Sequence, residues 1–244
     1  GSKKIIKIMI SLLVLMSMFF NLTVTTFAEN NTTIPKGYVT IAIEKFTLGL
    51  GYVIEPVKVP FYEGDNIAKL TVDLIGEDNY ESSGSVESGF YLSSIKDNDT
   101  REANVPQYIL DNIGDIGERS REGWLGEFDY AFMSGWMYSV NNKFPNFGAS
   151  DLEPTDGDVI RWQFTLSGFG MDIGGGFEGD SNSGSFEGSY IPIANRNELT
   201  KKIAEINSSP DKAIILAKDG VQEAYNKAYE VITVAESSQE EVDL

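Results

Sequence analysis

Side chains that carry out chemistry are unevenly represented in this chain of 244 residues, which contains no histidine and no cysteine. Without them the chain has no Ser-His-Asp triad, no cysteine nucleophile, and no thiolate or imidazole ligand for zinc, haem or an iron–sulfur cluster. Carboxylate, hydroxyl, lysine and tyrosine chemistry remains, as do oxygen-ligand sites for hard cations and binding without catalysis. We predict a non-enzymatic protein with no catalytic or metal-binding residues.

Acidic side chains are plentiful, with 37 Asp and Glu against 19 Lys and Arg and a net charge of −18. One acidic group lies between Asp151 and Asp158, and another between Asp172 and Asp180. Neither has the spacing of a calcium loop, and an acidic chain offers carboxylate pairs by chance. We therefore predict a solvated acidic face. The absence of a basic patch also argues against a nucleic-acid partner.

Aromatic side chains are the remaining candidates for a binding site. Trp136 and Tyr138 share one face of a predicted strand with Val140, and such amphipathic rings either pack in the core or line a ligand pocket. The asparagines of the following loop either form its turn or orient a ligand. The residues that we predict to contact a ligand are Trp124, Trp136, Tyr138, Asn141, Asn146 and Phe147. Phe128 and Tyr130 share the ambiguity of Trp124.

The elements that must position these rings follow from hydrophobic periodicity. Alternation predicts strands over 38–43 and, with two prolines that favour a sheet edge, over 52–61. Apolar residues at helical spacing predict a helix from Ile67 to Ile75, capped by Asp65. Other predicted elements are strands over 90–95, 135–141 and 159–166 and a short helix from 106 to 112. One face of the predicted strand 159–166 is expected to pack in the core, and it consists of Ile160, Trp162, Phe164 and Leu166.

Two later segments change character. Residues 167–188 contain eight glycines among polar residues, which indicates a long irregular loop. From residue 195 to 244, apolar residues at helical spacing predict a helical tail. This tail either docks on the preceding domain or links it to further domains.

The N-terminal residues have the pattern of an export signal. Gly1 and Ser2 resemble a vector-derived scar, and three lysines precede an apolar run from Ile8 to Phe20. Small residues ending at Ala28 suit a cleavage site, so we predict a signal peptide over 1–28, followed by a polar lead over 29–36. The apolar run is short for a membrane span. Without 1–28 the chain has 16 basic against 37 acidic groups, a net charge of −21. We expect a secreted or cell-surface protein with no stable membrane span after cleavage.

Three blocks of sequence resemble the signature of the transcobalamin C-terminal-like family of exported Gram-positive proteins. They are Gly135–Asn141, Phe144–Gly148 and Asp156–Trp162, in that order, preceded by Glu63-Gly64-Asp65 at the start of the predicted helix. The resemblance covers roughly residues 37–173. It implies an α+β fold, a β-grasp-like mixed sheet with one packed helix, in a domain that we extend over 37–190 with its glycine-rich loop.

The resemblance also implies a function, which is the binding of a soluble ligand such as cobalamin or another corrinoid. The helical barrel of transcobalamin has no counterpart here, and without histidine the chain cannot supply an imidazole ligand to cobalt. Any corrinoid would be held by shape, stacking and hydrogen bonds. Two alternatives remain: a structural or adhesion-type module of a surface protein that contacts another protein, and a glycan-binding domain that uses exposed Trp and Tyr.

Overall fold

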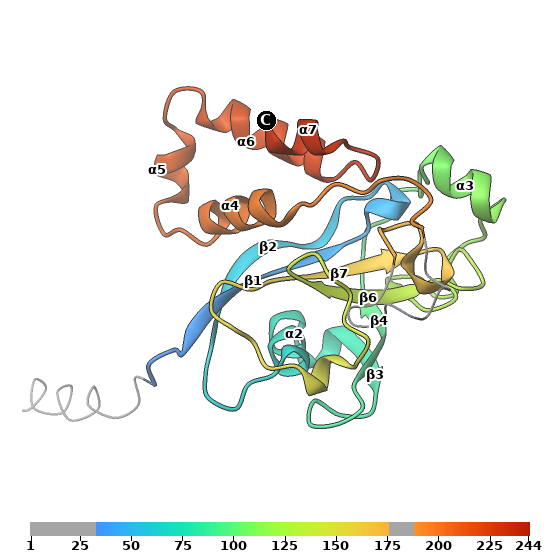
Figure 1. Cartoon of the computed structure of the whole chain (residues 1–244), viewed down its shortest axis with the longest axis horizontal. Coiled ribbons are helices and arrows are strands. Elements are labelled where there is room, and N and C mark those ends of the chain that lie inside the picture. Colours follow the sequence, from blue (N-terminus) through green and yellow to red (C-terminus); the bar gives the residue numbers. More distant parts are fainter. Residues whose placement is uncertain (1–32, 176–187) are drawn as a thin grey trace, which may run out of the picture. The chain divides into compact units, whose positions relative to one another are not determined.

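A mixed four-stranded sheet, called sheet A, organises the fold in the computed structural model (Figure 1). Its strands are, in spatial order, β2 (Tyr52–Phe61), β1 (Gly37–Glu44), β7 (Val159–Thr165) and β6 (Gly135–Val140). The two central strands are parallel, with Ile41 opposite Ile160, and each pairs antiparallel with its outer neighbour. This arrangement confirms the predicted α+β class and mixed sheet. β2 lies at an edge, as its prolines indicate.

The structure describes residues 33–175 and 188–244, and Pro35–Leu244 form one unit. The predicted signal peptide and the first half of the polar lead, residues 29–32, lie outside the described residues. So does the central part of the predicted glycine-rich loop, residues 176–187.

One face of sheet A packs against α2 (Ile67–Ile75), which lies below the sheet in Figure 1. Buried residues of β1, β7 and α2 belong to one core, and the Trp162 Nε1 atom donates to Thr71 Oγ1 over 2.9 Å. The predicted stripe from Ile160 to Leu166 is fully buried there, which confirms it as core. The helix cap is Asn66, whose Oδ1 accepts from the backbone of Lys69, while Asp65 binds the backbone of Tyr62. The prediction that Asp65 caps the helix was therefore wrong, because the cap is the next residue, Asn66.

A second, three-stranded antiparallel sheet adjoins the same core. It consists of β3 (Tyr80–Ser83), β4 (Tyr91–Lys96) and β5 (Trp124–Gly126). Of these three strands, the sequence predicts only β4; no strand was predicted at β3 or β5. Between β4 and β5 lies the short helix α3 (Gln107–Ile113).

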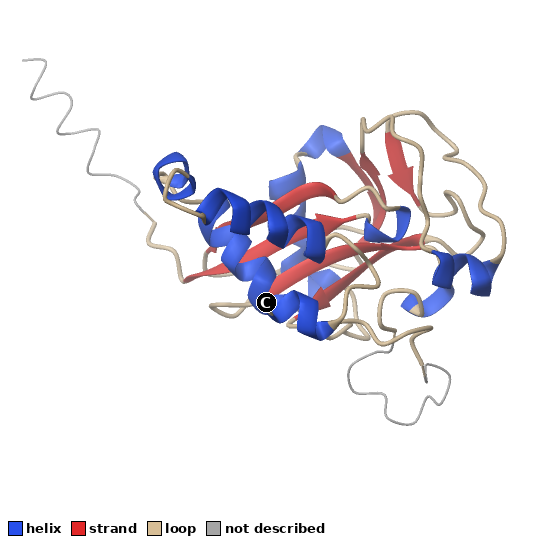
Figure 2. Cartoon of the chain, turned by 90° about the horizontal axis from the view of Figure 1, so that it is seen from above, coloured by secondary structure: helices blue, strands red, loops and turns tan. Residues whose placement is uncertain are grey.

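The C-terminal tail covers the opposite face of sheet A (Figures 1 and 2). Its helices are α4 (Asn197–Asn207), α5 (Lys212–Leu216), α6 (Val221–Ile232) and α7 (Gln239–Asp243). α4 lies along β2, where the Asn207 side chain donates to the Pro56 carbonyl oxygen and Ser208 Oγ accepts from the Lys58 backbone. Of the two alternatives that the sequence leaves open, the structure has the tail docked on the sheet.

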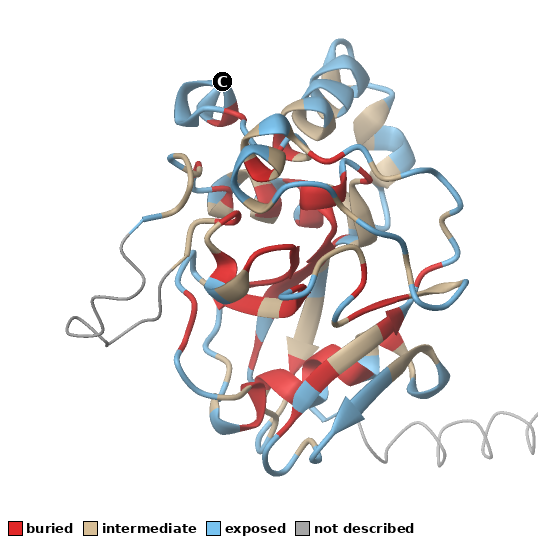
Figure 3. Ribbon diagram, turned by 90° about the vertical axis from the view of Figure 1, so that its right-hand side faces the viewer, coloured by how far each residue is buried: buried red, intermediate tan, exposed pale blue. Residues whose placement is uncertain are grey.

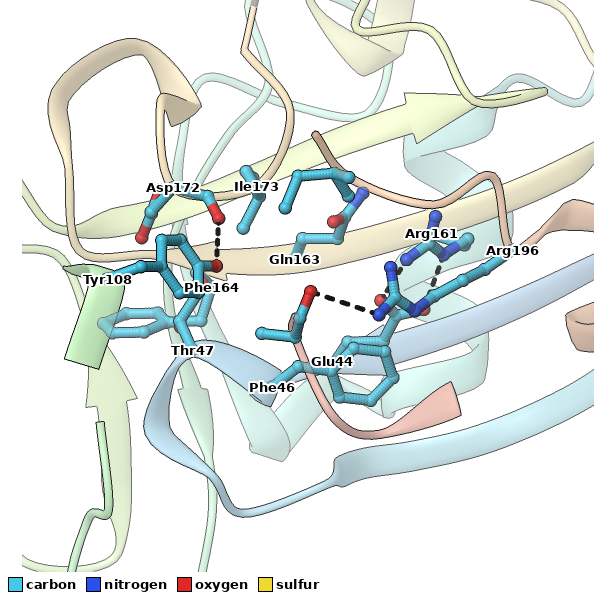
Figure 4. A pocket seen from close by; sticks show the side chains of 12 residues that line it. Glu44, Phe46, Thr47, Tyr108, Arg161, Gln163, Phe164, Asp172, Ile173 and Arg196 are labelled. Carbon is cyan, nitrogen blue, oxygen red and sulfur yellow. Dashed lines mark hydrogen bonds and ion pairs between the residues drawn. The ribbon is translucent and has the colours of Figure 1, made fainter. Parts of the chain in front are cut away.

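Because both faces of sheet A are covered, its central strands are buried on both sides, as the red segments of Figure 3 indicate. The tail-facing side is polar. Glu44 accepts two hydrogen bonds of 2.7 Å from the Arg161 guanidinium. Both residues line a cavity of about 20 Å³ that Arg196 also borders (Figure 4). Among the residues that the structure describes, no helix has the length and apolar content to cross a membrane.

Candidate functional site

The two hairpin rings predicted to contact a ligand, Trp136 and Tyr138, lie in the core. Trp136 is 6% exposed, its Nε1 donates to the Leu125 carbonyl oxygen over 2.9 Å, and its ring meets Phe164 edge-on at 5.3 Å. Tyr138 is 9% exposed and packs 5.1 Å from Trp162. Burial raises the pKa of the Tyr138 hydroxyl, which donates to the Phe147 carbonyl oxygen. The free ring surface that a stacked ligand needs is therefore not present at these two residues.

The other four predicted contacts are spread over two regions. Trp124 is half-buried in β5, with the Arg121 guanidinium 4.3 Å above its ring. Asn141 forms the turn of the hairpin: its φ is 50°, its Oδ1 accepts from the Val159 backbone, and its amide donates to Asp158. Asn146 and Phe147 are exposed in the loop that follows. Of the two roles considered for Asn141, forming the turn or orienting a ligand, the structure shows the first.

Exposed apolar side chains gather instead on the segment 126–134, which we call the aromatic loop. Phe132 is 85% exposed, Phe128 66% and Met133 50%. Exposed apolar groups that lie together on a surface mark an interaction site more often than isolated ones. Sequence reasoning marked Phe128 and Tyr130 but missed Phe132 and Met133. The signal that could have found them is a run of bulky apolar residues between two glycines, Gly126 and Gly135.

A buried carboxylate holds the aromatic loop in one conformation. The carboxylate of Asp129 is buried and accepts three hydrogen bonds of 2.8 Å, from the Ser120 backbone, the Ser120 hydroxyl and the Gly126 backbone. Phe128 and Tyr130 have φ values of 70° and 68°. Non-glycine residues in this left-handed region cost about 1 kcal/mol or more each, and such strain concentrates at functional sites. The aromatic loop is thus held in a strained backbone conformation that leaves its apolar side chains exposed to solvent.

A second loop lies against the aromatic loop. It follows β7 and contains Phe169, which is 51% exposed with a φ of 63°. A Cβ atom at Gly168 would lie 2.9 Å from the Met133 Cε atom, so the backbone of this loop closely approaches the Met133 side chain. The close approach places the loop that carries Phe169 beside the aromatic loop.

Tyr130 connects the aromatic loop to a charged groove of about 700 Å³, formed by residues 98–103 and 116–123. At its base the buried Lys45 ammonium contacts Asp97 and Asp99 at 2.9 and 2.8 Å, and Arg119 contacts Asp97 at 2.8 Å. Hydrogen bonds from Arg101, together with Lys45, hold the pKa of the Asp99 carboxyl well below its usual range. The groove therefore combines charged side chains held by ion pairs with the ring of Tyr130 at its border.

Within 33–175 and 188–244 the structure places no three His, Cys, Asp or Glu side chains so that they could hold a metal ion. An apolar wall beside a polar groove is the composition of a binding site. The chain is thus an α+β protein in which helices cover both faces of sheet A and the apolar side chains of the aromatic loop are exposed.

A family model described as a domain of unknown function, DUF4430, matches residues 71–165, which is less than half of the chain. The match runs from α2 to the end of β7 and includes the second sheet, the aromatic loop and the hairpin. No curated protein matches the chain.

Proposed function

We propose that this protein is an exported, non-enzymatic ligand-binding module of the transcobalamin C-terminal-like type, with a corrinoid as its first candidate ligand. The proposal draws on the three sequence blocks described above and on the matched family of unknown function, which is associated with transcobalamin-like C-terminal domains. The ligand surface is the aromatic loop with the adjoining groove. The buried hairpin rings are its support.

The observation that carries this proposal is the exposure of Phe128, Phe132 and Met133 on a loop pinned by Asp129. A corrinoid presents broad ring faces with amide groups at the rim. The apolar side chains of the aromatic loop suit a ring face, and the charged side chains of the groove suit the rim. Because the loop needs no ordering on binding, less conformational entropy is lost.

Titration of the purified chain with cobalamin tests the proposal, with corrinoid absorption and tryptophan fluorescence as readouts. We expect saturable binding that weakens at least tenfold in Phe132→Ser. The matched control is Ile214→Ser, because Ile214 is also exposed, at 66%, but lies on α5 in the tail. Absence of any spectral change at high micromolar cobalamin would contradict the corrinoid assignment.

A second function, an interaction module of a surface protein, is favoured by the burial of Trp136 and Tyr138. In this case the aromatic loop contacts a protein partner and no small molecule.

The glycan alternative has less support, because the Arg121 guanidinium covers one face of Trp124, the ring available to a sugar. Retention on a polysaccharide column that is lost in Trp124→Ala would favour glycans.

A further inference from the structure

The two faces of sheet A differ in composition. In β1 and β7 the residues that face α2 are apolar, whereas those on the opposite face, beneath the tail, are mostly polar. The polar set consists of Thr40, Glu44, Arg161 and Gln163, which are all less than 10% exposed. Strands that alternate in this way are typical of a sheet with one face in water. The tail therefore buries a face that has the composition of a solvated surface.

Packing between the sheet and the tail is incomplete. The cavity of about 20 Å³ is lined by Glu44 and Arg161 from the sheet and by Arg196 and Ala235 from the tail (Figure 4). It is large enough for a water molecule, whereas close-packed cores leave few such spaces. Asp172 also lines this cavity and is 0% exposed, so the prediction of a solvated acidic face was wrong for this residue.

Few direct bonds attach the tail to the sheet. In the part of the chain that the structure describes, two hydrogen bonds cross between them, those of Asn207 and Ser208 to β2, and no ion pair does. The buried Arg196 guanidinium donates to carbonyl oxygens of the tail itself, at Ile232 and Val234. These bonds hold the end of α6 to the start of α4, so the tail is tied together more firmly than it is tied to the sheet.

Apolar contacts of the tail are also modest. The helix α2 buries six of its nine residues, whereas α6 buries only Ile232 of its twelve, and α4 buries Thr200, Ile203 and Ala204 of its eleven. Hydrophobic stabilisation is proportional to the apolar area removed from water. Docking of the tail therefore contributes less stability per residue than docking of α2 on the other face.

Two hydroxyl groups at the interface are buried without a hydrogen-bond partner among the described residues. One belongs to Tyr52 of β2, whose ring packs 5.9 Å from that of Tyr229 in α6, and the other to Thr200 of α4. An unpaired buried hydroxyl is unfavourable. Both groups would gain hydrogen bonds to solvent if the tail moved away from the sheet.

We propose that the tail is a displaceable cover, which leaves sheet A as one unit while β1, β7 and α2 stay folded. Its release makes the face of Thr40, Glu44, Arg161 and Gln163 accessible as an interaction surface for a polar or charged partner. Exposure of this face costs little, because the Glu44 and Arg161 charges are better solvated in water than in a protein interior. This surface is not the aromatic loop, and the inference does not rest on the proposed function.

Two alanines of equal burial allow a matched test in the full chain. Ala42 lies in β1 on the tail face, Ala68 lies in α2 on the core face, and both are 0% exposed. Because the chain has no cysteine, Ala42→Cys and Ala68→Cys each contain a single thiol. Under native conditions, we expect a small thiol reagent to label Ala42→Cys at least about 100-fold faster than Ala68→Cys, since partial opening precedes global unfolding. Equal rates, or faster labelling of Ala68→Cys, would overturn the proposal.

A further substitution tests whether the tail is the part that opens. Asn207→Ala combined with Ser208→Ala removes both hydrogen bonds to β2. It should speed the labelling of Ala42→Cys about tenfold and leave that of Ala68→Cys unchanged. The matched control is Asn226→Ala, because the exposed Asn226 side chain accepts from Gln222 of the same helix, and it should change neither rate. An unchanged Ala42→Cys rate in the first variant would contradict the proposal.

If Ala42→Cys does not fold, hydrogen exchange of the unaltered chain decides. The amides of α4 and α6 should exchange at one common rate, at least about 100-fold faster than the amides of β1 and β7. Equal protection of the tail and these strands would show that the tail leaves only on global unfolding, which would overturn the proposal.

Discussion

Glu44→Gln is the substitution whose cost the structure defines best. Glu44, at the end of β1, and Arg161, within the neighbouring parallel strand β7, are both buried, and their two 2.7 Å hydrogen bonds form a bidentate pair. The variant keeps the shape of the side chain and removes its charge. It leaves Arg161 and the nearby Arg196 with no carboxylate partner, and burial followed by repulsion from Arg161 already lowers the pKa of Arg196 to about 10.

Breaking a buried ion pair by removing one partner costs about 3–5 kcal/mol, because the other charge stays buried and uncompensated. We expect Glu44→Gln to fall in this range. For a domain of this size, each 1 kcal/mol lowers the melting temperature by about 2–4 °C. The loss is a large part of the stability of an ordinary domain, which is about 5–15 kcal/mol.

Urea unfolding followed by circular dichroism measures the effect. The double variant Glu44→Leu with Arg161→Met should be closer to the wild type than Glu44→Gln, since apolar groups of similar volume can replace a buried pair. The control is Asp73→Asn, which breaks the exposed Lys69–Asp73 pair and should cost less than about 1 kcal/mol. A loss of less than about 1 kcal/mol in Glu44→Gln would refute the reasoning.

Three further outcomes are expected. Trp136→Phe leaves the Leu125 carbonyl oxygen without its donor and should cost about 1–3 kcal/mol in the free energy of unfolding, measured by urea; an unchanged midpoint would mean that the indole is not enclosed. Phe132→Ser should change stability by less than about 0.5 kcal/mol, because the side chain is 85% exposed, and a clear drop in melting temperature would mean that it packs in the fold. The pKa of Asp172, about 6 when folded, exceeds that of an unfolded Asp at about 4. Its stabilising contribution is therefore complete below about pH 4 and is lost as the pH rises through 6, by about 2–3 kcal/mol. Asp172→Asn should remove this dependence in unfolding curves taken from pH 4 to 7.5.

Some features of the fold were predictable because they depend on local pattern. Alternation at Val39, Ile41 and Ile43 and helical spacing from Ile67 to Ile75 specify which face of each element is apolar, and the structure buries those faces together. β3 and β5 were not predictable in the same way. They are short, and the Ser and Glu residues of β3 form a strand because β4 supplies the hydrogen-bonding partners.

The candidate site was less predictable. The spacing of Trp136 and Tyr138 places both rings on one face of the strand, but it does not say whether that face lines a pocket or packs in the core. In the structure the second sheet and α2 cover this face, so both rings are buried. The exposure of Phe132 depends on the buried Asp129, which is one of many acids in the sequence.

Residue types and their periods along the chain are local properties, and they were sufficient for the α+β class, the core stripe of β7 and the exclusion of histidine and cysteine chemistry. Whether a given side chain meets water depends on segments distant in sequence. The tail buries Arg161 opposite Glu44, and the β7 loop encloses Asp172. Burial and its electrostatic consequences arise from those long-range contacts, so they became visible only when the chain was folded.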